Sequence, residues 1–226
     1  MMNIQNAVKE GSQILKFFKS KTPLLDSEIL MSKAIHKDRH FVILHPNKKI
    51  KKNDFNFFKN LINQRSLGKP ISYLIGKKSF WKNEFEVNNN VLIPRPDTEI
   101  IIEETLKFVK KKNKLRILDI GIGSGCILLS ILKEKKNFYG VGIDISKKCI
   151  EMTKKNSLKL NLEKRVKFFK SNVDNFNYGK YDLILSNPPY IKQFDLKYLD
   201  RDVINFEPEI ALNGGLDGLS EIRKVI

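Results

Sequence analysis

An alternation of strand-like and helix-like segments constrains the fold of this 226-residue chain more than any other feature. Short apolar runs predict strands at 116–120, 138–143, 166–170 and 181–186. Segments of helical periodicity near 125–134 and 146–160 separate the first three of these strands. Strands that alternate with helices form mostly parallel sheets whose faces the helices cover. The sequence therefore predicts an α/β domain with a doubly wound sheet.

A glycine-rich loop follows the first predicted strand and opens a helix. Its five residues are Gly121, Ile122, Gly123, Ser124 and Gly125. Glycines let a ligand approach the backbone because no Cβ is in the way. Asp144 ends the second predicted strand, where a carboxylate can accept hydrogen bonds from both hydroxyls of a ribose. Loop and acid together predict a site for an adenosine-containing cofactor.

Two other interpretations of this loop stay open at this point. Dinucleotide sites use the spacing Gly-x-Gly-x-x-Gly. Here the spacing is Gly-x-Gly-x-Gly, and Cys126 stands where the third dinucleotide glycine would fall. A tight strand–helix turn without any ligand is the second alternative.

The tetrad Asn187-Pro188-Pro189-Tyr190 follows the fourth predicted strand and indicates a particular chemistry. A glutamine amide and the exocyclic amine of adenine are poor nucleophiles, because their lone pair is delocalised. The Asn187 side-chain oxygen and the Pro188 carbonyl can accept the two N–H groups of such a target nitrogen. They would then aim its lone pair at an electrophilic methyl group. Pro189 supplies no N–H for a strand ladder, which leaves the Pro188 carbonyl outside it, and Tyr190 offers a face for stacking. An ordinary proline-rich turn is the alternative. With the glycine loop at the same sheet edge, the tetrad favours S-adenosylmethionine as cofactor.

The first 96 residues have a different organisation. Helical periodicity predicts helices at 4–19, 24–36 and 53–66. Residues 1–75 are therefore predicted to form a small helical domain. Residues 76–96 are predicted to hold a hairpin and a linker, with the hairpin turn at Asn88-Asn89-Asn90. Residues 97–226 then form the α/β domain.

Charge and composition limit the class of protein. The formal net charge is +17, and residues 1–95 hold 18 Lys and Arg against 7 Asp and Glu. Such an excess favours contact with nucleic acid or a ribonucleoprotein, or else reflects lysines scattered over a solvated surface. The two cysteines fit a reduced, cytoplasmic protein without disulfides. The histidines, His36, His40 and His45, lack companion ligands, so we expect no metal site. No signal peptide or membrane span is expected.

Several segments resemble one family, the protein-(glutamine-N5) methyltransferases of peptide chain release factors. The similar segments are Leu25 to Leu30, Arg65 to Gly76, Phe80-Trp81, Val91 to Glu99, Phe206-Glu207-Pro208, Ala211-Leu212 and Gly215 to Leu219. The resemblance implies S-adenosylmethionine as methyl donor and the glutamine of the release factors' Gly-Gly-Gln motif as acceptor. It implies that the helical domain recognises the substrate. It also implies cofactor-binding roles for Gly121 to Gly125, Asp144 and Asn187, and glutamine-binding roles for Asn187, Pro188, Pro189 and Tyr190.

The chain departs from the family pattern in two places. The family often has Ser-Asp-Trp after the third strand, whereas this chain has Ser171-Asn172-Val173. Asn172 can still bind the adenine amine, but Val173 provides no ring for stacking. The family sheet has seven strands, and four are found here, so the sheet is expected to be C-terminally incomplete and the 226-residue form inactive or unstable. The alternative functions are a nucleic-acid adenine N6-methyltransferase and an inactive remnant that only binds a partner.

Overall fold

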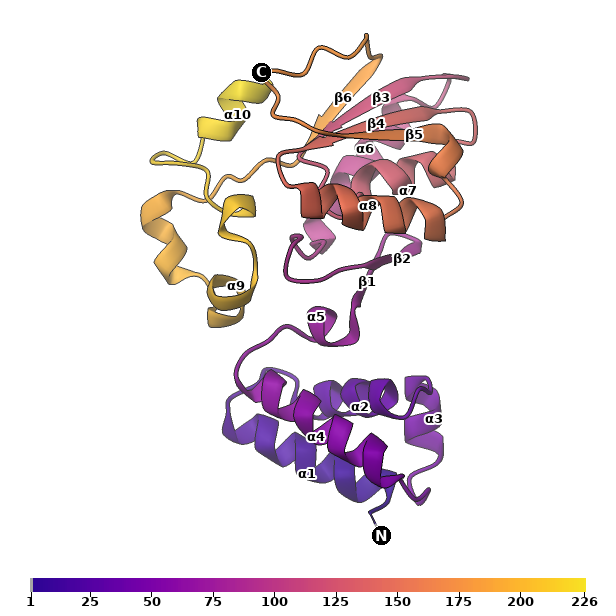
Figure 1. Ribbon diagram of the computed structural model, residues 1–226, viewed down its shortest axis with the longest axis vertical. Coiled ribbons are helices and arrows are strands. Elements are labelled where there is room, and N and C mark those ends of the chain that lie inside the picture. Colours follow the sequence, from indigo (N-terminus) through magenta and orange to yellow (C-terminus); the bar gives the residue numbers. More distant parts are fainter. Residues whose placement is uncertain (1) are drawn as a thin grey trace. The chain divides into compact units, whose positions relative to one another are not determined.

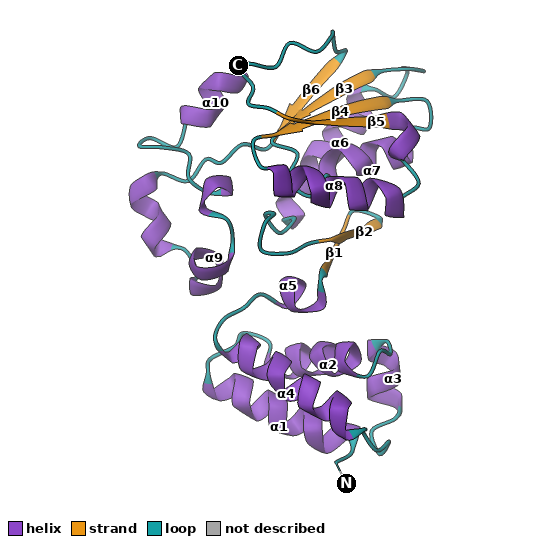
Figure 2. Ribbon diagram, in the orientation of Figure 1, coloured by secondary structure: helices purple, strands orange, loops and turns teal. Residues whose placement is uncertain are grey.

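The computed structural model describes residues 2–226, and the chain divides into two compact units. One unit comprises Met1–Ile75 and Arg201–Phe206, and the other comprises Gly76–Asp200 and Glu207–Ile226. Each unit has its own hydrophobic core. Figures 1 and 2 show the elements of both. Within residues 2–226 no helix combines the length and the apolar character needed to cross a bilayer.

The first unit is helical. Its elements are α1 (Ile4–Phe17), α2 (Pro23–Ala34), α3 (Arg39–Leu44), α4 (Lys52–Ser66), α5 (Ile71–Ile75) and α9 (Arg201–Phe206). The three helices predicted from periodicity are confirmed as α1, α2 and α4, within two residues at each end. Helices α3 and α5 are not predicted from the sequence, because six and five residues are too few to display a helical period.

A buried ion pair joins two of these helices. The Arg65 Nε atom of α4 lies 2.8 Å from an Asp26 carboxylate oxygen in the first turn of α2. The hydroxyls of Ser20 and Thr22 also donate to this carboxylate, at 2.9 and 2.8 Å. A buried carboxylate needs such partners, since an unpaired buried charge is costly. Asp26 and Arg65 each lie in a segment that resembles the family. The ion pair therefore gives both of these segments a structural role.

A short hairpin begins the second unit, and its predicted turn is wrong. The strands β1 (Lys77–Phe80) and β2 (Asn83–Glu86) pair antiparallel, so the chain turns at Trp81-Lys82 and not at Asn88-Asn89-Asn90. Trp81 has φ 53°, and its backbone N–H donates to the Glu99 carboxylate at 2.6 Å. The Asn88 side chain instead accepts from the Asn90 N–H, a local turn that leads into the linker.

The sheet of the second unit has four parallel strands in the order β5-β4-β3-β6. These strands are β3 (Arg116–Ile120), β4 (Tyr139–Asp144), β5 (Val166–Lys170) and β6 (Leu183–Ser186). All four predicted strands are confirmed within two residues at each end. Among the described residues β6 pairs only with β3 and forms one edge of the sheet.

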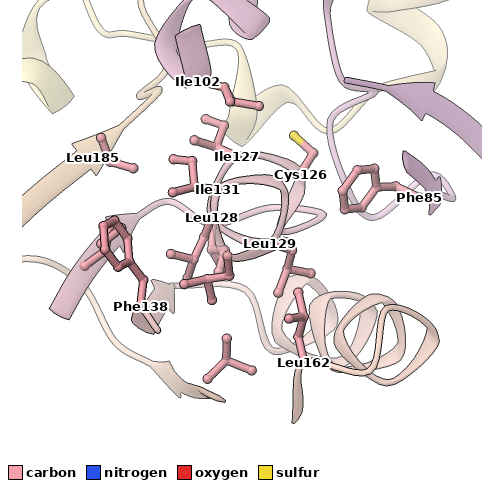
Figure 3. Close-up of a cluster of buried hydrophobic side chains, with 14 of the residues drawn as sticks. Phe85, Ile102, Cys126, Ile127, Leu128, Leu129, Ile131, Phe138, Leu162 and Leu185 are labelled. Carbon is pink, nitrogen blue, oxygen red and sulfur yellow. The ribbon is translucent and has the colours of Figure 1, made fainter. Parts of the chain in front are cut away.

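Three helices pack on one face of this sheet: α6 (Glu99–Phe108), α7 (Cys126–Glu134) and α8 (Lys147–Lys159). Helix α7 is the central one, because every residue from Cys126 to Leu132 is buried. Figure 3 shows its Ile127, Leu128 and Ile131 among side chains from α6 and β6. A helix that is apolar all round is expected only where it is enclosed. The glycine loop enters this helix, so the core fixes one end of the loop.

The opposite face of the sheet carries a smaller cluster. Its buried residues, Leu118, Ile120, Val141 and Ile143, are covered by side chains that include Val173, Phe176 and Val225. Val225 belongs to α10 (Ser220–Val225), which follows the short 3-10 helices Gln193–Tyr198 and Glu209–Ala211. The segment after β6 thus returns to the carboxyl end of the sheet.

Candidate active site

The strand register places the predicted site residues at one edge of the sheet. Ile120 at the end of β3 pairs with Ile143 of β4 on one side and with Ser186 at the end of β6 on the other. Gly121, Asp144 and Asn187 follow or close these strands, so they lie at the same edge. A cavity of about 820 Å³ opens there. Eight predicted site residues line it: Gly121, Gly123, Asp144, Asn172, Val173, Asn187, Pro188 and Pro189.

The glycine loop is held by backbone and side-chain hydrogen bonds. The N–H groups of Gly121 and Ile122 both donate to the Ile143 carbonyl, at 3.0 and 2.9 Å. The Thr153 hydroxyl donates to the Gly123 carbonyl at 2.7 Å. An added Cβ on Gly121 would meet no atom within 4 Å, so the space above this residue is open. The loop therefore presents bare backbone to the cavity.

The other three loop residues do not line the cavity. Ile122 is buried in the core beneath β4, and Ser124 is buried while its carbonyl accepts from the Asn156 amide at 2.9 Å. Gly125 is the N-cap of α7, with φ 81°. A Cβ there would lie 2.7 Å from Thr153 and 2.9 Å from Leu129, so this glycine permits close helix packing.

Asp144 is oriented by two backbone donors. One carboxylate oxygen accepts from the Gly123 N–H at 3.0 Å and the other accepts from the Ser146 N–H at 2.8 Å. Burial raises the pKa of Asp144, although these two N–H groups act to lower it. A carboxylate offers about four lone-pair positions, so each oxygen can accept one further hydrogen bond. Asp144 can therefore bind a vicinal diol without losing its support of the loop.

Asn172 and Val173 lie on another wall of the cavity. The Asn172 side-chain oxygen already accepts from the Asn175 N–H at 3.0 Å. Val173 packs on the sheet cluster together with Val225 of α10. Ile145 follows Asp144, lines the cavity and is half exposed. The apolar contacts available to a flat ligand here are thus aliphatic ones.

Asn187 is anchored on both sides. The preceding Ser186 donates its hydroxyl to the Ile120 carbonyl at 3.0 Å, which fixes the end of β6. The Asn187 amide nitrogen lies 3.4 Å from the Thr98 hydroxyl oxygen, a long hydrogen bond to the linker. With its nitrogen occupied, the amide can present its oxygen to a substrate. Tyr190 does not line the cavity, and its side chain is 65% exposed.

Other parts of the cavity wall were not predicted from the sequence. Asn90 and Leu92 come from the segment before the linker, and Pro208, Glu209, Ile210 and Ala211 come from the segment after the tetrad. Glu207 fixes the second segment, since its carboxylate accepts from Arg95 at 2.5 Å and from the Ile93 N–H at 3.3 Å. The sequence did contain a signal for both segments, because each includes residues that resemble the family. Those residues were not assigned a role in the site.

Comparisons with known proteins find similar domains and similar whole chains. Residues 6–76 match the family model described as PrmC N-terminal domain, and residues 98–204 match that of the Methyltransferase small domain. The chain is 38% identical to the release factor glutamine methyltransferase of Clostridium acetobutylicum over 99% of its own length and 80% of that protein. It is 39% identical to the protein of the same name from Buchnera aphidicola subsp. Baizongia pistaciae, over 100% of this chain and 80% of the relative.

One solved structure is similar to this chain in fold. The hMettl16 catalytic domain, in complex with a MAT2A 3′UTR hairpin, aligns over 62% of this chain and 54% of that one. The TM-score is 0.52 and the sequence identity is 18%. At this identity the likeness concerns the methyltransferase fold and not the substrate.

Proposed function

The chain belongs to the release factor glutamine methyltransferase family, and from this premise we propose how its site works. It transfers a methyl group from S-adenosylmethionine to the side-chain amide nitrogen of the glutamine in a release factor's Gly-Gly-Gln motif. The observation that carries the proposal is Asn187, whose amide nitrogen is occupied by Thr98 at the wall of the cavity. Its oxygen is then available to accept an N–H of the target amide.

The residues present fit S-adenosylmethionine. The cavity volume lies in the range of small-molecule sites. Asp144 keeps an acceptor position on each oxygen for the two ribose hydroxyls, and the space above Gly121 is open. When bound, S-adenosylmethionine supplies an electrophilic methyl group on a sulfonium. The chain's own part is to hold the acceptor: the Asn187 oxygen and the Pro188 carbonyl accept the two N–H groups of the glutamine amide and turn its lone pair toward the methyl group.

The proton needs no dedicated base in this proposal. Methyl transfer makes the amide nitrogen cationic and therefore acidic, so the proton leaves afterwards. The Pro188 carbonyl is available, because no backbone N–H among the described residues donates to it. The Tyr190 ring is exposed outside the cavity, where it can contact the protein substrate.

Charge around the tetrad supports a protein substrate over a nucleic acid. Residues 190–200 and 207–226 hold four basic side chains against six carboxylates, a net charge of −2, whereas the whole chain is +17. A polyanion is disfavoured where the local charge is negative. The basic excess of residues 1–95 lies elsewhere on the chain. Contact of that part with nucleic acid stays a prediction.

The function is tested by methyl transfer from tritiated S-adenosylmethionine. The purified chain is offered a release factor, the same factor with its Gly-Gly-Gln glutamine changed to alanine, DNA and tRNA. The site geometry leads us to expect label in the unaltered release factor alone, against the sequence-based expectation of an inactive form. Label in DNA or tRNA would favour the adenine methyltransferase instead. No label in any acceptor would contradict the proposed function for this chain and would favour the inactive form.

Asp144→Ala is expected to weaken S-adenosylmethionine binding by about ten- to a hundredfold. The physical reason is the loss of a charged acceptor for two hydroxyls, which typically costs about 1.5–3 kcal/mol. Titration calorimetry measures the dissociation constant. Glu163→Ala, which removes an exposed carboxylate, is the control and should leave the constant unchanged. An unchanged constant in the Asp144 variant would remove this residue from the cofactor site.

A further inference from the structure

The backbone of the tetrad has little means of holding itself in place. Pro188 and Pro189 have no N–H, so neither can donate a hydrogen bond to a neighbouring strand. The upstream end is fixed by β6 and by the Ser186 hydroxyl on the Ile120 carbonyl. The downstream end, from Tyr190 onward, lies in no named strand or helix until residue 193. Support for it must come from another segment.

The structure provides that support in residues 212–218, here called the glycine brace. The Ile191 N–H donates to the Leu212 carbonyl at 3.1 Å, and the Gly214 N–H donates to the Ile191 carbonyl at 2.8 Å. The Gln193 N–H adds a third bond to the Gly215 carbonyl at 2.9 Å. Ile191 and Asn213 form an isolated parallel bridge. The brace is thus paired with the residues directly after the tetrad, as one strand is with another.

Two glycines set how closely the brace approaches. A Cβ added to Gly214 would lie 2.8 Å from the Tyr190 Cα, 2.8 Å from the Gly218 carbonyl oxygen and 2.9 Å from the Pro189 carbonyl oxygen. A Cβ added to Gly218 would lie 2.5 Å from the Tyr190 carbonyl oxygen. All these neighbours are backbone atoms, so they cannot yield as the end of a flexible side chain does. A side chain at Gly214 must push Pro189 and Tyr190 away.

The brace itself is held by polar side chains. The Asn213 side-chain oxygen accepts from the Gly215 N–H at 2.9 Å, and Asp217 accepts from the Leu219 N–H at 3.0 Å. Arg223 of α10 forms an ion pair with Asp217 at 2.6 Å. Residue 213 also lines the cavity. The segment is therefore an ordered partner for the tetrad.

We propose that the glycine brace, through Gly214, is the positioning element that sets the place of the Pro188 carbonyl and of Asn187. This inference rests on the proposed function for its kinetic consequence. The acceptor amide must meet two oxygens whose separation is fixed by the tetrad backbone. A displacement of about 1 Å at such a site can cost about a hundredfold in rate. The cofactor contacts at Asp144 and Gly121 belong to other strands and are not displaced with it.

The test compares Gly214→Ala with Gly11→Ala. Gly11 is the control for an added Cβ, because its Cβ would also meet atoms at 2.7 to 2.9 Å, although these are side-chain atoms, and because it lies in α1 of the other unit. For Gly214→Ala we expect kcat of methyl transfer to a release factor to fall at least tenfold. The dissociation constant of S-adenosylmethionine should change less than threefold. Gly11→Ala should lower the melting temperature without lowering kcat.

A double-mutant cycle separates positioning from general damage. If the brace acts through the tetrad, Gly214→Ala should cost less than threefold further in an Asn187→Ala background. A full tenfold further loss there would overturn the inference. So would a Gly214→Ala enzyme with the kcat of the unaltered chain. Asn213→Ala is the milder variant should Gly214→Ala not fold; it should also lower kcat, and Asn213→Asp, which keeps the acceptor for Gly215, should restore most of it.

Hydrogen exchange tests the brace without any methyl acceptor. The amides of Ile191, Gln193 and Gly214 should be protected together in the unaltered chain and should lose protection together in Gly214→Ala. Exchange of these amides at the rate of exposed loops in the unaltered chain would contradict the brace. Protected amides in a chain that methylates no release factor would instead contradict the proposed function and leave the brace standing.

Discussion

Asn187→Ala is expected to lower kcat of methyl transfer by about a hundredfold or more. The change removes an acceptor that is aimed at the amide in the transition state, and single acceptors or donors of that kind typically contribute on this scale. The Thr98 hydroxyl, which lies 3.4 Å from the Asn187 nitrogen, would be left without this partner. Initial rates with a release factor at saturating S-adenosylmethionine measure the effect.

Three comparisons give this prediction its specificity. The dissociation constant of S-adenosylmethionine should change much less than kcat, because Asp144 and the glycine loop remain. Tyr190→Ala should chiefly raise KM for the release factor, since the ring is exposed outside the cavity. Asn177→Ala, which removes an exposed amide between β5 and β6, should behave like the unaltered chain. Near-normal turnover of the Asn187 variant would refute orientation of the amide as the mechanism.

Local pattern was sufficient to predict which residues meet at the carboxyl edge of the sheet. Parallel strands end at a common edge, so residues that follow them in sequence converge in space. Gly121, Asp144 and Asn187 illustrate this, because each is tied to an apolar run with a recognisable end. Their convergence on one cavity depends on the register of β3 with its two neighbours.

Features fixed by distant partners could not be predicted in the same way. The hairpin turn is set at Trp81, whose backbone N–H and indole N–H reach Glu99 and Glu134. The wall after the tetrad is set by Glu207, whose partner Arg95 lies 112 residues earlier. Neither contact leaves a periodic or compositional trace near the residue that it positions. For the same reason the close contact of Gly214 with Tyr190 could not be predicted from the Gly214-Gly215 pair in the sequence.

Asp119→Asn is expected to remove much of the pH dependence of stability of the second unit. Asp119 lies in β3 and is buried, and burial raises its pKa from 3.8 to about 7. The Leu128 backbone N–H lowers the pKa in part, and the charge of Asp144 raises it further. Within the described residues its Oδ2 atom has no hydrogen-bond partner. The folded state therefore favours the protonated acid.

The sign of the effect follows from proton linkage. Between about pH 4 and pH 7 the unfolded chain has released this proton while the folded chain retains it, so the free energy of unfolding falls as the pH rises. Three pKa units correspond to about 4 kcal/mol in total, and the part between pH 5 and pH 8 is about 3 kcal/mol. The unaltered chain should therefore lose about 3 kcal/mol more than Asp119→Asn between pH 5 and pH 8.

Urea denaturation followed by tryptophan fluorescence measures the stability of the second compact unit, because the single tryptophan, Trp81, belongs to that part of the chain. Glu103→Gln, which alters an exposed carboxylate of α6, should keep the pH dependence of the unaltered chain. The asparagine variant can be less stable than the unaltered chain at pH 5, since a buried amide group without a partner has its own cost. The comparison that decides is the change between the two pH values. Equal changes in the unaltered chain and in Asp119→Asn would show that Asp119 is ionised in the folded state without penalty, and that some other donor reaches it beneath the glycine loop.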